Sequence, residues 1–262
     1  MTPVTGADLT VPERFRGPSR SGNGGWTAGS LAERLLASAD RPGKHVPVEV
    51  TLRQPPPLDT PLTVEHLDGD DGSLTVLAFE GARIAEARRV DSPLTPVDKV
   101  DPSTAQAAMR SYAGLRSHPF PGCFACGPDR ADGDGLRIFP GPAGPGTVAS
   151  CWLPHHSLAE SGDVVDTGDR GAQRVGHGTT WAALDCVGGW SADLVGRPMV
   201  LGRMTARVDA LPVVGEPHVV VGRRLRADGR KTFTASTLYD ADGRVVGTAE
   251  HVWIAVDPAT FS

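Results

Sequence analysis

The stretch VGHGTTWAALDCVGGWSADLV, Val175 to Val195, decides our interpretation of the fold. At about 100° per residue, a helix places five of its side chains on one side: Trp181, Leu184, Gly188, Ser191 and Val195. Asp185 falls roughly a quarter-turn from the centre of that side, where a helix borders a cleft. We therefore predict a helix that buries one face and carries a single carboxylate beside a cleft. The alternative is an ordinary carboxylate on a helix surface.

The start of this helix offers a second feature. The hydroxyls of Thr179 and Thr180 are suited to cap the backbone N–H groups that a first turn leaves unpaired. Those same N–H groups could instead face a ligand. The second interpretation makes Thr179 and Thr180 candidate substrate-binding residues.

Composition limits the class of protein. The chain has 262 residues, of which 39% are apolar, and a formal net charge of −5. This length and apolar content suit one large domain or two small ones with a real core, and the negative charge argues against a general nucleic-acid binder. We find neither an apolar run long enough to span a membrane nor a secretory signal pattern, so we expect a cytoplasmic protein with reduced cysteines.

Two similar units follow one another along the chain. The first has a helix over 21–40, with Asn23 as its cap, and then four strands: 46–52, 61–67, 73–79 and 82–90. The second has a strand at 147–153, the helix with Asp185 and four more strands: 199–208, 218–226, 231–239 and 244–256. We predict an α+β fold with halves at 1–95 and 147–262, joined by a Pro- and Gly-rich connection at 96–146.

The two units match in kind and nearly in spacing, which indicates an internal repeat. Trp26 in GGWTAGSL corresponds to Trp181 in TTWAALDC, and Thr51 in VEVTLR corresponds to Thr205 in GRMTAR. GARIAEARRV in turn corresponds to GRVVGTAEHV. A helix followed by four antiparallel strands, occurring twice, is a narrow architectural pattern.

This unit resembles the hotdog fold, and two copies in one chain resemble the double-hotdog type II acyl-CoA thioesterases. The first half carries glycines similar to those that begin the family's first helix: Gly24, Gly25 and Gly29. Ser30 stands where Asp185 stands in the second half, and WAALD looks like the family segment that ends in a catalytic Asp. GTAEHVWI resembles the stretch with a catalytic Gln, whose position is taken here by Glu250, and Thr205 is nearest to the family's third site residue, a Thr.

The resemblance implies a hydrolase that cleaves a CoA-type acyl thioester without a cofactor. Asp185 would be the base or nucleophile, with Glu250 and Thr205 beside it. Backbone N–H groups near Gly24 and Gly25, or near Thr179 and Thr180, would bind the oxyanion. Glu250 shares strand parity with several apolar residues, which favours the core side, but the opposite parity is nearly as apolar, so its direction stays open. Hotdog sheets often pair with one another, so a homo-oligomer is a further possibility.

Two other functions remain alternatives. One is a protein of the same fold that binds an acyl or CoA-type ligand without turnover, which the change from Gln to Glu favours because a carboxylate accepts where an amide donates. The other is a hydratase or dehydratase. Against it, the chain has neither the His-to-Glu spacing of acyl-carrier dehydratases nor the Asp-x-Asn-x-x-His pattern of hydratases.

The connection contains CFACG, with Cys123 and Cys126 in half of a zinc-ribbon pattern. We predict no metal here, and instead a turn packed over the sheet by its aromatic residues: Phe120, Phe124 and Phe139. A zinc site is the alternative. It would need two further ligands, for which we considered His118, Cys151, His155 and His156.

Overall fold

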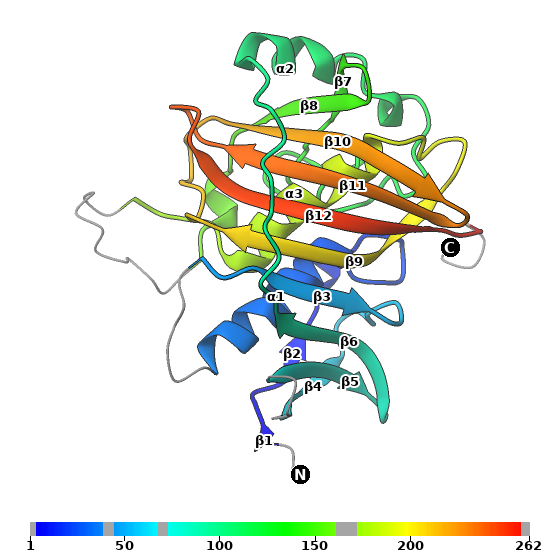
Figure 1. Cartoon of the computed structure of the whole chain (residues 1–262), viewed down its shortest axis with the longest axis vertical. Coiled ribbons are helices and arrows are strands. Elements are labelled where there is room, and N and C mark those ends of the chain that lie inside the picture. The colour runs from blue at the N-terminus through cyan, green and yellow to red at the C-terminus, as the bar shows by residue number, and fades with distance from the viewer. Residues whose placement is uncertain (1–3, 39–44, 68–72, 161–171, 258–262) are drawn as a thin grey trace.

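A computed structural model describes residues 4–38, 45–67, 73–160 and 172–257 (Figure 1). These residues form a 12-stranded antiparallel sheet in the order β1-β4-β5-β6-β3-β9-β12-β11-β10-β8-β7, with β2 paired to β4. The strands before the connection are β1 (Val4–Thr5), β2 (Leu9–Thr10), β3 (Val48–Leu52), β4 (Pro61–Leu67), β5 (Leu74–Phe79) and β6 (Ala82–Arg89). The later strands are β7 (Gly141–Gly144), β8 (Thr147–Trp152), β9 (Met199–Val208), β10 (His218–Asp228), β11 (Lys231–Tyr239) and β12 (Val245–Ala255).

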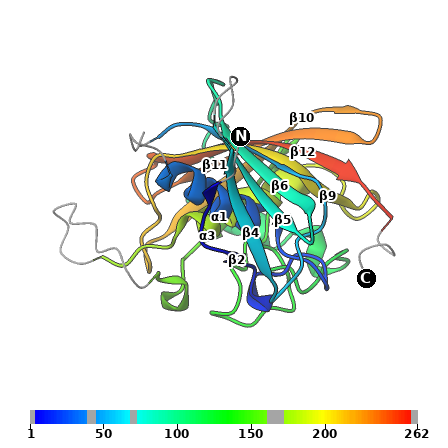
Figure 2. The same cartoon turned by 90° about the horizontal axis from the view of Figure 1, so that it is seen from below.

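The α-helices are α1 (Gly24–Ala37), α2 (Pro102–Met109) and α3 (His177–Trp190), and there are short 3-10 turns at η1 (Glu13–Phe15), η2 (Ala113–Leu115) and η3 (His156–Leu158). Seen from below, the sheet curves around α1 and α3 (Figure 2). No helix in the described part of the chain is long and apolar enough to cross a membrane.

The early and late strands meet where β3 pairs with β9. Val48 lies opposite Ala206, and Val50 lies opposite Met204. All four of these side chains are buried, so the junction is part of the core rather than an interface between separate cores.

Glycines let α1 and α3 lie in direct contact. A Cβ atom on Gly25 would fall 2.4 Å from Cβ of Asp185, and one on Gly29 would fall 2.7 Å from Cβ of Trp181. Because the earlier residue of α1 meets the later residue of α3, the two helices run antiparallel. This contact brings the first turn of α1 to Asp185.

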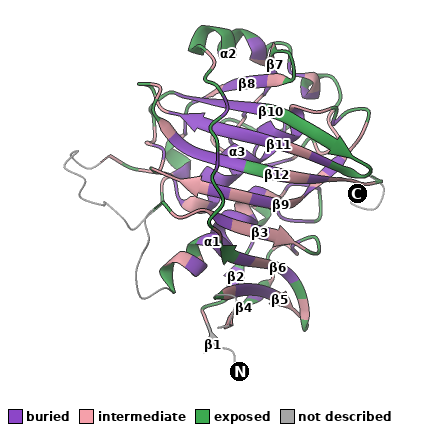
Figure 3. Cartoon of the chain, viewed as in Figure 1, coloured by how far each residue is buried: buried purple, intermediate pink, exposed green. Residues whose placement is uncertain are grey.

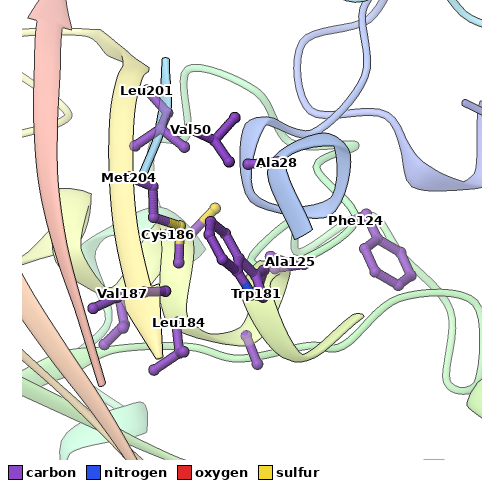
Figure 4. Packing of buried hydrophobic residues seen from close by; sticks show 14 of the residues in the cluster. Ala28, Val50, Phe124, Ala125, Trp181, Leu184, Cys186, Val187, Leu201 and Met204 are labelled. Carbon is purple, nitrogen blue, oxygen red and sulfur yellow. The ribbon is translucent and has the colours of Figure 1, made fainter. Parts of the chain in front are cut away.

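The predicted burial of α3 on one face is wrong. Every residue from Gly178 to Trp190 is buried (Figure 3). Figure 4 shows the reason: Trp181, Leu184 and Val187 point toward the sheet near Met204, while α1 lies against the helix. A helix enclosed on more than one side has no solvent face to keep polar.

The expected strands are confirmed within a few residues, and the Asn23 cap of the first helix is confirmed by its side chain, which accepts from Trp26 N–H. The capping role of Thr179 and Thr180 is wrong, because α3 begins two residues earlier and its N-cap, Gly176, has no side-chain hydrogen bond. The Thr180 hydroxyl donates to the carbonyl of Gly176. The sequence also predicts a polar loop at 158–174 and the end of the first helix at Gly43. The loop lies mainly, and Gly43 wholly, outside the described residues.

The connection is more ordered than its composition predicts, since it contains α2, which Asp101 caps. Phe124 lies edge-on to Phe15, just before α1, and the Tyr112 ring, on which Phe139 stacks, meets Trp190 of α3. The backbone N–H of Phe139 donates to the Ser150 hydroxyl of β8. The predicted packing over the sheet is therefore wrong for Phe124, whose ring lies against the segment before α1, whereas Phe139 lies next to a strand.

Candidate active site

Asp185 lies at the contact between α3 and the first turn of α1. Its side chain is 2% exposed. Its Oδ2 accepts from the backbone N–H of Gly25 at 2.9 Å and from Asn23 Nδ2 at 3.3 Å. Its Oδ1 is also buried and has no hydrogen-bond partner among the described residues. One carboxylate oxygen is thus fixed and the other remains available.

The sequence positions this carboxylate through the helix start. Asn23 caps α1 with its carbonyl oxygen, which leaves its amide N–H₂ to reach Asp185. Gly25 has no side chain to keep α3 away. The unpaired N–H groups and the dipole at a helix N-terminus favour a negative charge there, so the cap and the glycine together hold an anion.

Burial raises the pKa of Asp185 to about 7, the Gly25 N–H opposes this rise, and the nearby Cys123 thiol adds to it. A carboxyl group with this pKa is present in both protonation states near neutral pH. Groups poised in this way are suited to proton transfer.

A cavity of about 250 Å³ opens beside Asp185. Its walls are mostly apolar, and Leu201 and Trp253 contribute to them, whereas Asn23, Gly24 and Asp185 supply polar groups. Gly24 borders this cavity, and its backbone N–H, in the first turn of α1, has no acceptor among the described residues.

Glu250 and Thr205 do not join this site. They are cross-strand neighbours on β12 and β9. Glu250 is exposed, while the next residue, His251, is buried against Gly188 of α3. Because successive side chains of a strand point to opposite faces, Glu250 and Thr205 lie on the sheet face away from Asp185. The direction of Glu250, which the sequence left open, is therefore away from the core, since His251 and Trp253 occupy the inward positions.

Thr179 and Thr180 also lie away from the cavity, and neither borders it. The first turn of α3 lies instead against the middle of α1, where a Cβ on Gly178 would fall 2.6 Å from the Ser30 hydroxyl. Gly178 therefore faces Ser30 much as Gly25 faces Asp185. Of the predicted site residues, the structure brings together Asp185, Gly24 and Gly25.

Sequence analysis missed the surroundings of Cys123. This thiol lies 3.7 Å from the Cys186 thiol and 3.7 Å from Asn23 Nδ2. Cys126 lies in the same cluster, and His118 Nε2 is 3.3 Å from its sulfur. The one signal in the sequence was a further cysteine, Cys186, directly after the candidate site residue Asp185. Nothing local to CFACG indicates that it lies near α3.

The other ligands considered for zinc lie elsewhere. The Cys151 thiol donates to the carbonyl of Pro102, and the His155 ring contacts Ser157. His156 stacks beside His155. Among the described residues, none of the three is part of the cysteine cluster.

No protein-family model and no curated protein matches this sequence. Solved structures do match its fold. A hotdog-fold protein from Alicyclobacillus acidocaldarius is 13% identical, with a TM-score of 0.54 over 96% of this chain and 92% of that chain. An acyl-CoA thioesterase II from Mycobacterium marinum is 11% identical, with a TM-score of 0.59 over 97% of this chain and 94% of that chain.

A protein assigned as a thioesterase from Novosphingobium aromaticivorans is also 11% identical, with a TM-score of 0.62 over 95% of both chains. Identities this low show the fold alone. The chain therefore has a hotdog fold, which confirms this part of what its resemblance implied.

Proposed function

We propose that this chain is an acyl-CoA thioesterase-like hydrolase with Asp185 as its base or nucleophile. The observation that carries the proposal is the Oδ1 atom of Asp185, which is buried and without a partner at the edge of an apolar cavity. The thioesterase names of structures with the same fold support it.

We also propose that the fold is a tandem of two hotdog units, at 1–95 and 147–262, with 96–146 between them. The reciprocal contacts of α1 and α3 support this arrangement, because Ser30 meets Gly178 where Asp185 meets Gly25. Only the second unit carries an acid at this position. A duplicated chain of this kind needs only one competent site.

The reaction would begin with the thioester carbonyl in the cavity and its oxygen next to the free N–H of Gly24. A water molecule attacks the carbonyl carbon while Asp185 Oδ1 accepts its proton. The N–H donor stabilises the oxyanion that forms. The C–S bond then breaks, and the departing thiolate takes the proton from Asp185 to leave a carboxylic acid and CoA. Apolar walls suit an acyl chain.

The test is release of free thiol from acyl-CoAs of short, long and aromatic acyl groups by wild type and Asp185→Asn. The amide has nearly the shape of the carboxylate but cannot accept the proton, so we expect kcat to fall at least a hundredfold. The variant should still bind substrate. Glu250→Gln, on the opposite sheet face, should keep the wild-type rate and separates the two carboxylates. Equal rates for wild type and Asp185→Asn would remove Asp185 from the mechanism.

A binding protein without turnover is the second candidate. It is favoured by the hydrogen bond from Gly25 to Asp185, which occupies a donor that the oxyanion would otherwise use. In that case we expect no release of free thiol from any acyl-CoA. CoA thioesters should still raise the melting temperature of the protein, because a ligand that binds only the folded state stabilises it.

A further inference from the structure

Three buried thiols meet beside the proposed site, and the hydrolysis proposed above uses none of them. Cys123, Cys126 and Cys186 are free, fully enclosed cysteines whose sulfur atoms all lie within 4.8 Å of one another. The first two come from the CFACG turn and the third from α3. The fold thus brings three sulfur atoms, which are soft metal ligands, together from two separate segments.

The distance between the sulfurs of Cys123 and Cys186 is that of two metal ligands. A zinc ion binds thiolates at about 2.3 Å, so the sulfurs at two corners of its tetrahedron lie about 3.8 Å apart. The sulfurs of Cys123 and Cys186 are 3.7 Å apart, whereas a disulfide would need about 2.05 Å. We propose that Cys123, Cys126 and Cys186 bind a zinc ion.

Nearby N–H donors suit three thiolates. Asn23 Nδ2 lies 3.7 Å from the Cys123 sulfur and 3.9 Å from the Cys186 sulfur. His118 Nε2 lies 3.3 Å from the Cys126 sulfur, while its Nδ1 accepts from the Phe120 N–H at 2.9 Å. Because Nδ1 is an acceptor, the proton of the neutral ring is on Nε2 and points to sulfur. His118 would therefore not bind the metal itself but would donate a hydrogen bond to its ligand Cys126, as the hydrogen-bond partners of metal ligands commonly do.

Three protein ligands leave one position of a tetrahedral ion for a fourth. Cys123 and Cys186 both border the cavity that contains Asp185, so this fourth ligand comes from the cavity, as water or as a small ligand. Sites with three protein ligands and one exchangeable position are typical of reactive zinc, whereas structural zinc has four protein ligands. The ion would also fasten the CFACG turn to α3.

The test uses the full-length chain, purified under reducing conditions. Elemental analysis should find one zinc per chain, and a chelator should remove it and lower the melting temperature. The metal-free protein should then take up one Co²⁺ and develop the thiolate-to-cobalt charge-transfer and visible bands of tetrahedral cobalt. These readouts do not depend on hydrolysis, so they stand apart from the test of Asp185.

Variants define the ligands. Cys186→Ser and Cys126→Ser should weaken zinc binding at least a hundredfold, whereas the matched control Cys151→Ser, outside the cluster, should bind as wild type. His118→Gln keeps an N–H donor and should lose about tenfold in affinity. The proposal is overturned if reduced wild type binds no stoichiometric zinc or cobalt, if Cys186→Ser binds them equally well, or if the native protein contains a Cys123–Cys186 disulfide.

Discussion

His251 lies between the sheet and α3, in contact with the Thr234 hydroxyl and with Gly188. Its burial lowers its pKa to about 4, whereas an unfolded chain has a histidine pKa near 6.5. Below a pH of about 6.5, His251 therefore binds a proton in the unfolded state but not in the folded state. The free energy of unfolding should therefore fall by roughly 3 kcal/mol as the pH drops from about 6.5 to about 4.

Urea unfolding at a series of pH values measures this loss. His251→Gln cannot titrate and should show a shallower decline over the same range. The remaining decline comes from the carboxylates and from His118, His177 and His218, whose pKa values burial also lowers. Identical slopes for wild type and variant would mean that His251 becomes protonated inside the fold.

Single residues mark where sequence alone was insufficient. Asp185 was found as a candidate because the helix pattern places it at the border of a buried face, and Gly25 because it lies in a glycine-rich helix start. The direction of Glu250 was undecided, since both faces of its strand are apolar, and only the pairing of β12 with β9 and its packing on α3 resolve it. Cys186 joined Cys123 through a contact between distant segments, which no local pattern records.

At the scale of elements, the contact between α1 and α3 depends on Gly29. A Cβ there would lie 2.7 Å from Cβ of Trp181 and 2.8 Å from the carbonyl of His177. Alanine is the better helix former by about 1 kcal/mol, but the clash involves backbone and a buried indole. We expect Gly29→Ala to destabilise the protein by about 2 kcal/mol, seen as a lower melting temperature.

Gly144→Ala is the matched control, because a Cβ at Gly144 would meet nothing within 4 Å. It should leave the melting temperature almost unchanged. A Gly29→Ala variant as stable as this control would show that the helices can separate slightly without cost.

Elements were predictable where one periodicity dominates. The alternating strands 199–208 and 231–239 match β9 and β11 residue for residue. The short β7 was missed because GPAG has no alternating apolar pattern. The helix pattern predicted the position of α3 along the chain. It could not predict that α3 is buried on all sides, because that burial depends on contacts with α1 and the connection.

The larger of the two apolar clusters in the described residues runs through both proposed units, and this determines how the molecule should unfold. The β3–β9 junction buries Val48 and Val50 against the later strands, and α1 depends on α3 for the partner of its glycine face. Residues 1–95 alone would expose both surfaces to water at once. Neither unit can therefore keep its core without the other, and we expect one cooperative transition rather than two.

Urea unfolding followed by circular dichroism and by tryptophan fluorescence measures this directly. Circular dichroism follows both units, whereas four of the five tryptophans lie in the later unit and only Trp26 in the earlier one. Coincident curves with a single midpoint are the expected result, because coincidence of independent probes is the signature of two-state unfolding. The isolated 1–95 fragment should lack a cooperative transition. Two separated midpoints, or a fragment that melts like the intact chain, would show that the junction joins two cores that are stable on their own.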